Sequence, residues 1–208
     1  MGKVDDNKRL KLNSMLDAAL QLFTDRGLAK TSISDIVNRS GVAKGTFYLY
    51  FKDKYDIRNK LVAHESRKLL RSAYQAMLEA DPQGLEEQMI FITDHLISTL
   101  TERQPLLVLI SKNLSWGVLK REIIRPDADE DFEFLPVLHS LTAPYGLTTQ
   151  ESEIMLYLLV ELVGASCYSA TLYQEPCDLE TLKPHLFQTV RAIVRQFTSA
   201  HNKPEEDA

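Results

Sequence analysis

The stretch Thr31–Phe51 reads TSISDIVNRSGVAKGTFYLYF and predicts two short helices joined by a turn. Ser32 and Asp35 stand three residues apart, which is the spacing of a capping box, so the first helix begins at Ser32. Gly41 ends that helix, because glycine readily adopts the left-handed conformation found just after a helix. The second helix covers about residues 43–50, and the pair has the helix-turn-helix pattern.

The second helix of this pair has two different faces when successive residues are placed about 100° apart. Phe47 and Phe51 share one face, which we expect to be core. The outer side carries five residues, with the two tyrosines on its flanks: Gly45, Thr46, Tyr48, Leu49 and Tyr50. A short helix with an outer face of this kind suits the major groove of DNA.

Each outer residue has a chemistry that suits DNA. Thr46 and Leu49 can touch base edges, including thymine methyl groups. The glycine lets the backbone approach closely, and the tyrosines can donate hydrogen bonds to phosphates. Lys44 and Lys54 lie at helix starts within reach of the DNA backbone, and Ser34 lies beside the free N–H groups of the preceding helix. The alternative for the two lysines is that they are simply solvated.

Apolar periodicity predicts helices over the rest of the chain and therefore an all-α fold. The first helix runs from about Lys8 to Arg26 and is closed by Gly27, and a longer one begins at Asp53 and stops at Asp81-Pro82. Further helices are expected at about 84–102, 105–121, 131–143, 148–173 and 179–199, with a break at Arg125-Pro126 and a polar tail from His201. We expect an N-terminal three-helix domain at residues 1–55 and a larger helical domain at residues 56–208.

Charge is divided unevenly along the 208 residues. Residues 1–60 hold 12 Lys and Arg against 7 Asp and Glu, whereas residues 61–208 hold 12 against 22. A basic first part and an acidic remainder are typical of a protein that meets DNA with one end. The N-terminus does not resemble a signal peptide, and two cysteines do not suggest a disulfide scaffold, so a reducing cytoplasm is the expected location.

Four segments together resemble the DNA-binding domain of TetR-family regulators. They are Leu16–Phe23 (LDAALQLF), Gly27, Thr31–Val37 (TSISDIV) and Ser40–Lys54 (SGVAKGTFYLYFKDK). The resemblance implies a homodimer on a palindromic double-stranded DNA operator, and a second domain that dimerises and binds a small-molecule effector. Carried over position by position, it implies DNA contacts from Ser34, Lys44, Thr46, Tyr48, Leu49, Tyr50 and Lys54. Leu49 and Tyr50 depart from the side chains common in the family, so the operator sequence is not implied.

Two apolar stripes in the last two helices are candidates for the dimer interface. The stripes are Ile154, Leu158, Leu162 and Ala165 in one helix, and Leu186, Val190, Ile193 and Phe197 in the other. Paired with their symmetry mates, they would form a four-helix bundle. The alternative is that both helices bury these stripes in their own subunit. Glu161 interrupts the apolar run of the helix that carries Ile154. It has three interpretations: contact with a cationic effector, contact with a partner-chain base, or an exposed edge.

Pocket walls and catalytic groups are weakly indicated by the sequence. Candidate pocket residues are Phe91, His95, Trp116, Tyr157 and Cys167, each also compatible with ordinary core. Neither the histidines nor the cysteines have metal-ligand spacing, and we expect no cofactor and no enzyme activity. A membrane span is not expected at 154–174, which we interpret as a buried helix. The main alternative function keeps DNA binding but gives the second domain a protein partner, and a cavity of a few hundred cubic ångströms would distinguish the two.

Overall fold

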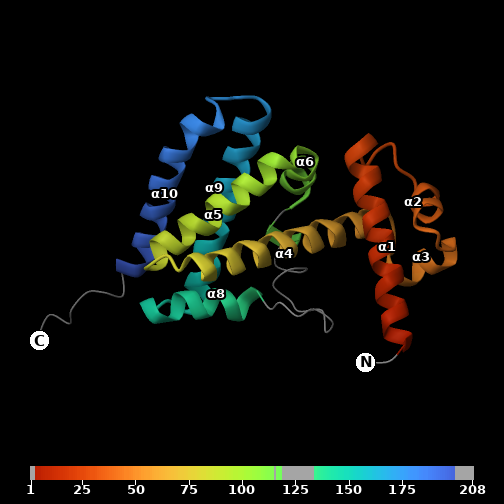
Figure 1. Cartoon of the computed structure of the whole chain (residues 1–208), viewed down its shortest axis with the longest axis horizontal. Helices are drawn as coiled ribbons and strands as arrows, with labels where there is room; N and C mark the ends of the chain where they lie inside the picture. The colour runs from red at the N-terminus through yellow and green to blue at the C-terminus, as the bar shows by residue number, and fades with distance from the viewer. Residues whose placement is uncertain (1–2, 115, 119–133, 200–208) are drawn as a thin grey trace, which may run out of the picture.

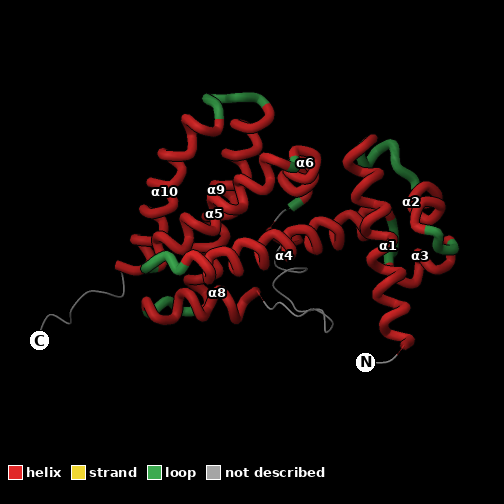
Figure 2. Tube along the Cα trace, viewed as in Figure 1, coloured by secondary structure: helices red, strands yellow, loops and turns green. Residues whose placement is uncertain are grey.

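The computed structural model describes residues 3–114, 116–118 and 134–199, and all regular structure in these ranges is helical (Figures 1 and 2). The predicted all-α fold class is therefore confirmed. The elements are α1 (Lys3–Arg26), α2 (Ile33–Ser40), α3 (Lys44–Tyr50), α4 (Lys54–Ala80), α5 (Leu85–Glu102), α6 (Gln104–Asn113), α7 (Trp116–Val118), α8 (Phe134–Thr142), the 3-10 turn η2 (Ala143–Tyr145), α9 (Thr149–Leu172) and α10 (Leu179–Ser199). We call α1–α3 the head and α5–α10 the body, with α4 joining them.

The head contains the predicted helix-turn-helix, and its local signals act as expected. The Asp35 N–H donates to Ser32 Oγ at 3.1 Å, and the Ser32 N–H donates back to the Asp35 carboxylate at 2.8 Å. This capping box satisfies two N–H groups that a helix start leaves free. Gly41 has φ 71°, and its N–H donates to the Val37 carbonyl, which closes α2 and turns the chain into α3.

The core of the head is built where the three helices meet the start of α4. Phe47 is 0% exposed and Phe51 is 1% exposed, with ring centroids 5.2 Å apart. Their neighbours in this cluster, from α1 and α2, are Met15, Leu16, Ala18, Ala19, Leu22, Phe23, Ile36 and Val37. Both phenylalanines thus lie on the inner side, as the sequence predicts, and they fix the orientation of α3.

Helix α4 runs from the head into the body, where it lies across the other helices (Figure 1). Asp53 caps its start by accepting hydrogen bonds from the N–H groups of Tyr55 and Asp56. The predicted boundary between residues 55 and 56 falls in the first turn of this helix and stays a prediction. Glu65, only 3% exposed, pairs with Lys68 at 3.1 Å and with Arg103 at 3.7 Å, and so ties α4 to the turn between α5 and α6.

The body packs five longer helices around several small apolar clusters. α10 lies along α5, and two ion pairs connect them, Arg191 with Glu87 and Arg195 with Glu86, each at 2.9 Å. The buried cluster beneath them consists of Leu85, Met89, Ile90, Leu147, Met155, Leu159, Val190 and Val194. Helix α9 runs through the body and packs against α5, α6, α8 and α10.

Some helix limits differ from the predictions. α1 begins at Lys3 instead of Lys8, because its first turns have too few apolar residues for periodicity to detect. The helix expected at 105–121 ends at Asn113, where the Asn113 side-chain amide donates to the Leu109 carbonyl and Leu114 is extended. Residues 119–121 and 131–133, the break at Arg125-Pro126 and the tail from His201 lie outside the described residues.

The proposed interface stripe of α10 is wrong. Leu186 and Val190 are 3% and 0% exposed, and Ile193 and Phe197 pack against the core of their own subunit. The stripe faces α5 and α9 of its own subunit. The prediction failed because periodicity shows that a helix has an apolar side but not which neighbour covers it. The stripe of α9 is different: Ile154 is 44% exposed and Leu158 is 36% exposed.

Helix α9 is also the one helix in the described ranges long and apolar enough to cross a membrane, by length and composition alone. A core helix of a soluble protein passes the same test. Only 28% of the apolar window of α9 is buried in the subunit, so the expectation of a buried helix holds for part of this helix alone.

Candidate nucleic-acid interface and internal cavity

The outer face of α3 is exposed. Leu49 is 83% exposed and Tyr48 is 53% exposed, and Lys44 and Gly45 are exposed beside them. Thr46 is half-buried. A leucine this exposed has no packing role in the subunit, which makes it a candidate contact for a partner surface.

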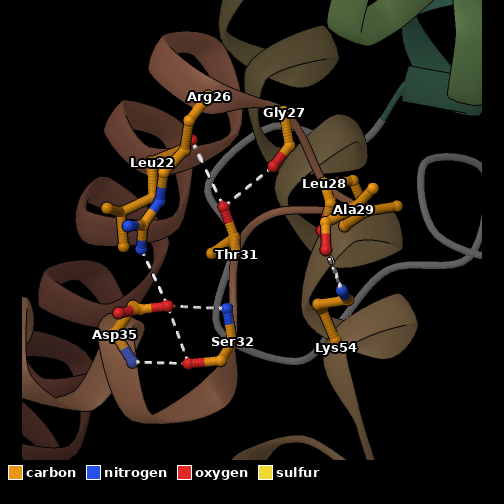
Figure 3. A network of polar contacts seen from close by, with 9 residues as sticks. All are labelled: Leu22, Arg26, Gly27, Leu28, Ala29, Thr31, Ser32, Asp35 and Lys54. Carbon is orange, nitrogen blue, oxygen red and sulfur yellow. Dashed lines mark hydrogen bonds and ion pairs between the residues drawn. The ribbon is translucent and has the colours of Figure 1, made fainter.

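Three further candidate DNA contacts surround α3. Ser34 is exposed on α2, close to the capping box. Tyr50 is half-buried, and its hydroxyl donates to the Lys8 carbonyl at 3.4 Å. Lys54 is half-buried, and its ammonium donates to the Leu28 carbonyl at 2.7 Å (Figure 3). In this structure Tyr50 and Lys54 are therefore engaged in holding α1 and the following loop.

Gly45 has a special position on this face. A Cβ added to Gly45 would meet nothing within 4 Å, and its backbone is not in the left-handed region. Nothing inside the subunit therefore requires glycine here, although glycine weakens a helix relative to alanine. The missing side chain leaves the backbone of α3 accessible on its outer side.

A polar network holds the turn between α1 and α2 in place (Figure 3). The Thr31 hydroxyl, which is fully buried, contacts the carbonyls of Gly27 at 2.9 Å and Leu22 at 3.3 Å. Hydrogen bonds from the Ser32 hydroxyl and N–H, together with the Arg26 guanidinium, lower the pKa of Asp35 to about 2. The Arg26–Asp35 ion pair measures 2.8 Å and joins α1 to the start of α2.

Sequence reasoning overlooked one cation on this side of the molecule. Arg39 is exposed on α2, and its Nε donates to the Gln21 side chain at 2.8 Å. The only available signal was its place in the last turn of α2, where a basic residue also favours the helix dipole.

The second candidate site is a cavity of about 490 Å³ lined by α4, α5, α6, α8 and α9 and open to solvent on one side. Most of its lining is apolar, with leucine and isoleucine side chains from all five helices. Two hydroxyl groups of the lining, Ser66 Oγ and Thr171 Oγ1, are buried and have no hydrogen-bond partner among the described residues. Volumes of about 300 to 1,000 Å³ are typical of small-molecule sites.

Of the five pocket residues considered from sequence, only Cys167 lines this cavity. Burial raises the pKa of its thiol to about 11, so the reactive thiolate is scarce near neutral pH. Trp116 and Tyr157 instead pack edge to face at 5.1 Å, and His95 contacts the Ser72 hydroxyl at 3.2 Å. Phe91 does not line the cavity either.

Glu161 lies where the cavity meets the solvent. It is exposed and also belongs to the lining, as does the neighbouring Ala165. In the single subunit Glu161 is an exposed edge at the mouth of the cavity, and contact with a partner-chain base stays open because Glu161 lies one turn after the exposed Leu158.

The sequence model for bacterial regulatory proteins of the tetR family matches residues 15–61, which cover the helix-turn-helix and the start of α4. The regulator AcrR of Shigella flexneri is 34% identical over 93 residues, which are 43% of this chain and 42% of AcrR. This chain thus spans less than half the length of the curated relatives it matches. They are named as regulators, in agreement with the expectation that the chain is not an enzyme.

Solved structures extend the likeness to the whole fold. A TetR-family regulator from Streptomyces coelicolor superposes with a TM-score of 0.66 at 16% identity, covering 90% of this chain and 99% of that one. FadR of Bacillus subtilis, solved with stearoyl-CoA, superposes with a TM-score of 0.60 at 17% identity, covering 86% and 97%. Residues 15–61 thus match the tetR-family model of bacterial regulatory proteins, and the fold of the chain is similar to that of solved TetR-family regulators.

Proposed function

We propose that this chain is a DNA-binding transcriptional regulator, a repressor that a small-molecule effector releases from a palindromic operator. The observation that carries the proposal is the two-sided α3. Its inner side is fixed by the buried Phe47, whereas Leu49 and Tyr48, whose ring packs edge-on against Phe47, are exposed on the outer side. A rigid helix with an exposed reading face is what insertion into a major groove needs.

The proposed DNA contacts are those expected from the sequence, divided into two groups by their surroundings. Lys44, Gly45, Tyr48 and Leu49 are exposed on α3, and Ser34 is exposed on α2, so these five are available to DNA in the present conformation. Thr46, Tyr50 and Lys54 are half-buried, and Tyr50 and Lys54 also make internal hydrogen bonds. We infer that these two contribute first by positioning the head.

The cavity supports a small-molecule effector over a protein partner, because a mostly apolar space of about 490 Å³ suits a small ligand. Helix α6 connects this space to the head. Leu107 and Ile110 of α6 line the cavity, while Leu109 and Ile110 pack in the cluster that contains Phe47. A ligand in the cavity would thus change the position of the head, provided that it binds one arrangement of α6 more tightly than another.

A homodimer is part of the proposal, and the exposed side of α9 supports it. Ile154, Tyr157 and Leu158 are 44%, 39% and 36% exposed on one helix. A two-fold axis beside α9 would bury these side chains against their copies and set the two α3 helices one DNA turn apart, about 34–36 Å. We expect Leu158→Glu to yield monomers in sedimentation velocity. Leu78→Glu, at a leucine that is 56% exposed on α4, should leave the dimer intact.

The function is tested by titrating the full chain against the DNA just upstream of its own gene over a range of salt. Leu49→Ala should weaken binding at least about fivefold, the loss expected for one base contact. The control Leu78→Ala removes an exposed leucine from α4 and should leave binding unchanged. Lys44→Ala should weaken binding and reduce the salt slope by about one per subunit, and Tyr48→Phe should weaken binding without altering the oligomer. Wild-type affinity in all three α3 variants would contradict the proposed interface.

A further inference from the structure

The lining of the cavity includes several hydroxyl groups, and these differ in whether they are satisfied. Thr101 lines the cavity, but its hydroxyl donates to the Ile97 carbonyl at 2.7 Å. Ser66, which is 6% exposed, has no partner for its Oγ among the described residues, and neither does Thr171. A buried hydroxyl without a partner is costly, and it calls for a partner such as an ordered water or a bound ligand. Ser66 and Thr171 come from α4 and α9, two of the five helices that line the space.

The charges of the lining residues also restrict the kind of ligand that the cavity can bind. No Lys, Arg or His belongs to the described lining, and Glu161 is its one charged side chain. Glu161 is exposed at the mouth, and the other described side chains of the lining carry no charge. Moving an unpaired charge from water into such a space costs several kcal/mol.

We propose that the cavity binds an uncharged, mainly hydrocarbon molecule that has one small hydrogen-bonding group, a hydroxyl or carbonyl, for Ser66. The proposal rests on the regulator function above and specifies the chemical class of its effector. The ligand's hydrocarbon part fills the space between the leucine and isoleucine side chains, where burial of apolar surface supplies the affinity. Its polar group completes the hydrogen bonding that the protein leaves unmade at Ser66.

The charge requirement is tested with three probes that share one chain and differ in the head group: decan-1-ol, decanoate and decyltrimethylammonium. Each competes with the uncharged fluorescent dye N-phenyl-1-naphthylamine for the full-length protein in solution, without DNA. We expect decan-1-ol to displace the dye at a concentration at least about tenfold lower than either ion, as follows from the cost of burying a charge. Equal or better displacement by decanoate or by decyltrimethylammonium overturns the proposal.

The location is tested by filling the cavity at Gly164. This glycine lines the space from within α9, and a Cβ added to it meets nothing within 4 Å. We expect Gly164→Leu to abolish dye binding, whereas Gly164→Ala, which occupies little of the volume, retains it. Circular dichroism and the melting temperature verify that both variants fold. Undiminished dye binding by a folded Gly164→Leu variant overturns the assignment of the site.

The hydrogen-bonding role is tested by a matched pair that does not depend on Gly164. Ser66→Ala removes the unpartnered hydroxyl and should weaken decan-1-ol about threefold to tenfold, as for the loss of one neutral hydrogen bond. Thr101→Val removes a hydroxyl of the same lining that is already bonded to Ile97, and should leave decan-1-ol binding unchanged. Equal effects of the two substitutions contradict the role of Ser66.

Failure of this inference and failure of the regulator function give different results. A protein that binds its upstream DNA but prefers a charged probe is a regulator with another class of effector. A protein that binds decan-1-ol through Ser66 but binds no DNA in a sequence-dependent way has the proposed cavity and not the proposed function.

Discussion

Thr31 in the head and Thr171 in the body are both polar side chains in apolar surroundings, but only one of their hydroxyl groups is satisfied. Thr31 contacts two carbonyls at the end of α1, whereas Thr171 has no partner among the described residues. The same contrast holds for the packing, because the head is filled around Phe47 and the body has a cavity of about 490 Å³. A surface that reads DNA needs fixed geometry, while a site that accepts a ligand needs unfilled space and unmade hydrogen bonds.

The largest expected difference between head and body is the loss of stability when a buried side chain is shortened. Phe47→Ala should lower the free energy of unfolding by about 3–5 kcal/mol, because it leaves a void in a closed core. Leu141→Ala, on the wall of the existing cavity, should cost less than half as much, because a side chain beside an empty space makes fewer contacts. Urea denaturation of both variants measures this. Similar losses would mean that the wall is packed as tightly as the head.

A second pair compares the two threonines directly. Thr31→Val leaves the contacts to Leu22 and Gly27 unmade and should lower the free energy of unfolding by about 1–3 kcal/mol. Thr171→Val replaces an unpartnered hydroxyl with a methyl group of similar volume and should be neutral or stabilising. The same denaturation experiment measures both, and a destabilised Thr171→Val variant would reveal a bond at that hydroxyl.

A third pair uses two helical glycines that have empty space around them. Gly45→Ala and Gly164→Ala should each change stability by at most about 1 kcal/mol, and in the stabilising direction, because alanine favours a helix. Only Gly45→Ala should weaken DNA binding, since the added methyl group stands on the outer face of α3. A gel-shift titration measures the DNA affinity of both variants. Unchanged affinity of the Gly45→Ala variant would contradict a close approach of DNA at this position.

The smallest effect concerns pH and is confined to the head. The pKa of Asp35 lies at about 2, below its ordinary value of 3.8, because Ser32 and Arg26 stabilise the carboxylate. A lowered folded pKa means that this contribution to stability is complete above 3.8 and is lost as the pH falls toward 2. Carbon-13 NMR titration of the Asp35 carboxyl should give a midpoint near 2, and Asp35→Asn should lack this part of the acid sensitivity. A midpoint close to 3.8 would show that the contacts at α2 are not maintained in solution.

Much of the head could be predicted because its signals are local. The capping box of Ser32 and Asp35 and the closing turn at Gly41 each depend on residues within a few positions of one another. The inward side of Phe47 follows from helical periodicity alone. Whether the outer face of α3 contacts DNA stays a prediction.

The parts that could not be predicted depend on residues far apart in the chain. Lys54 reaches the carbonyl of Leu28, 26 positions earlier, and nothing near Lys54 in sequence indicates that bond. The stripe of α10 was assigned to a partner subunit because its pattern is the same whichever helix covers it. A cavity is still harder to predict, because it is the space left between the side chains of five separate helices.

The length of α4 has a mechanical consequence. Its 27 residues form one helix that begins beside α3 and passes the cavity, so it acts as a lever about 40 Å long. A tilt of only about 5° at one end of such a lever displaces the other by about 3.5 Å, which follows from its length. Hydrogen bonds tolerate displacements of a few tenths of an ångström, so the geometry can convert a slight rearrangement around the cavity into complete loss of register at the far end.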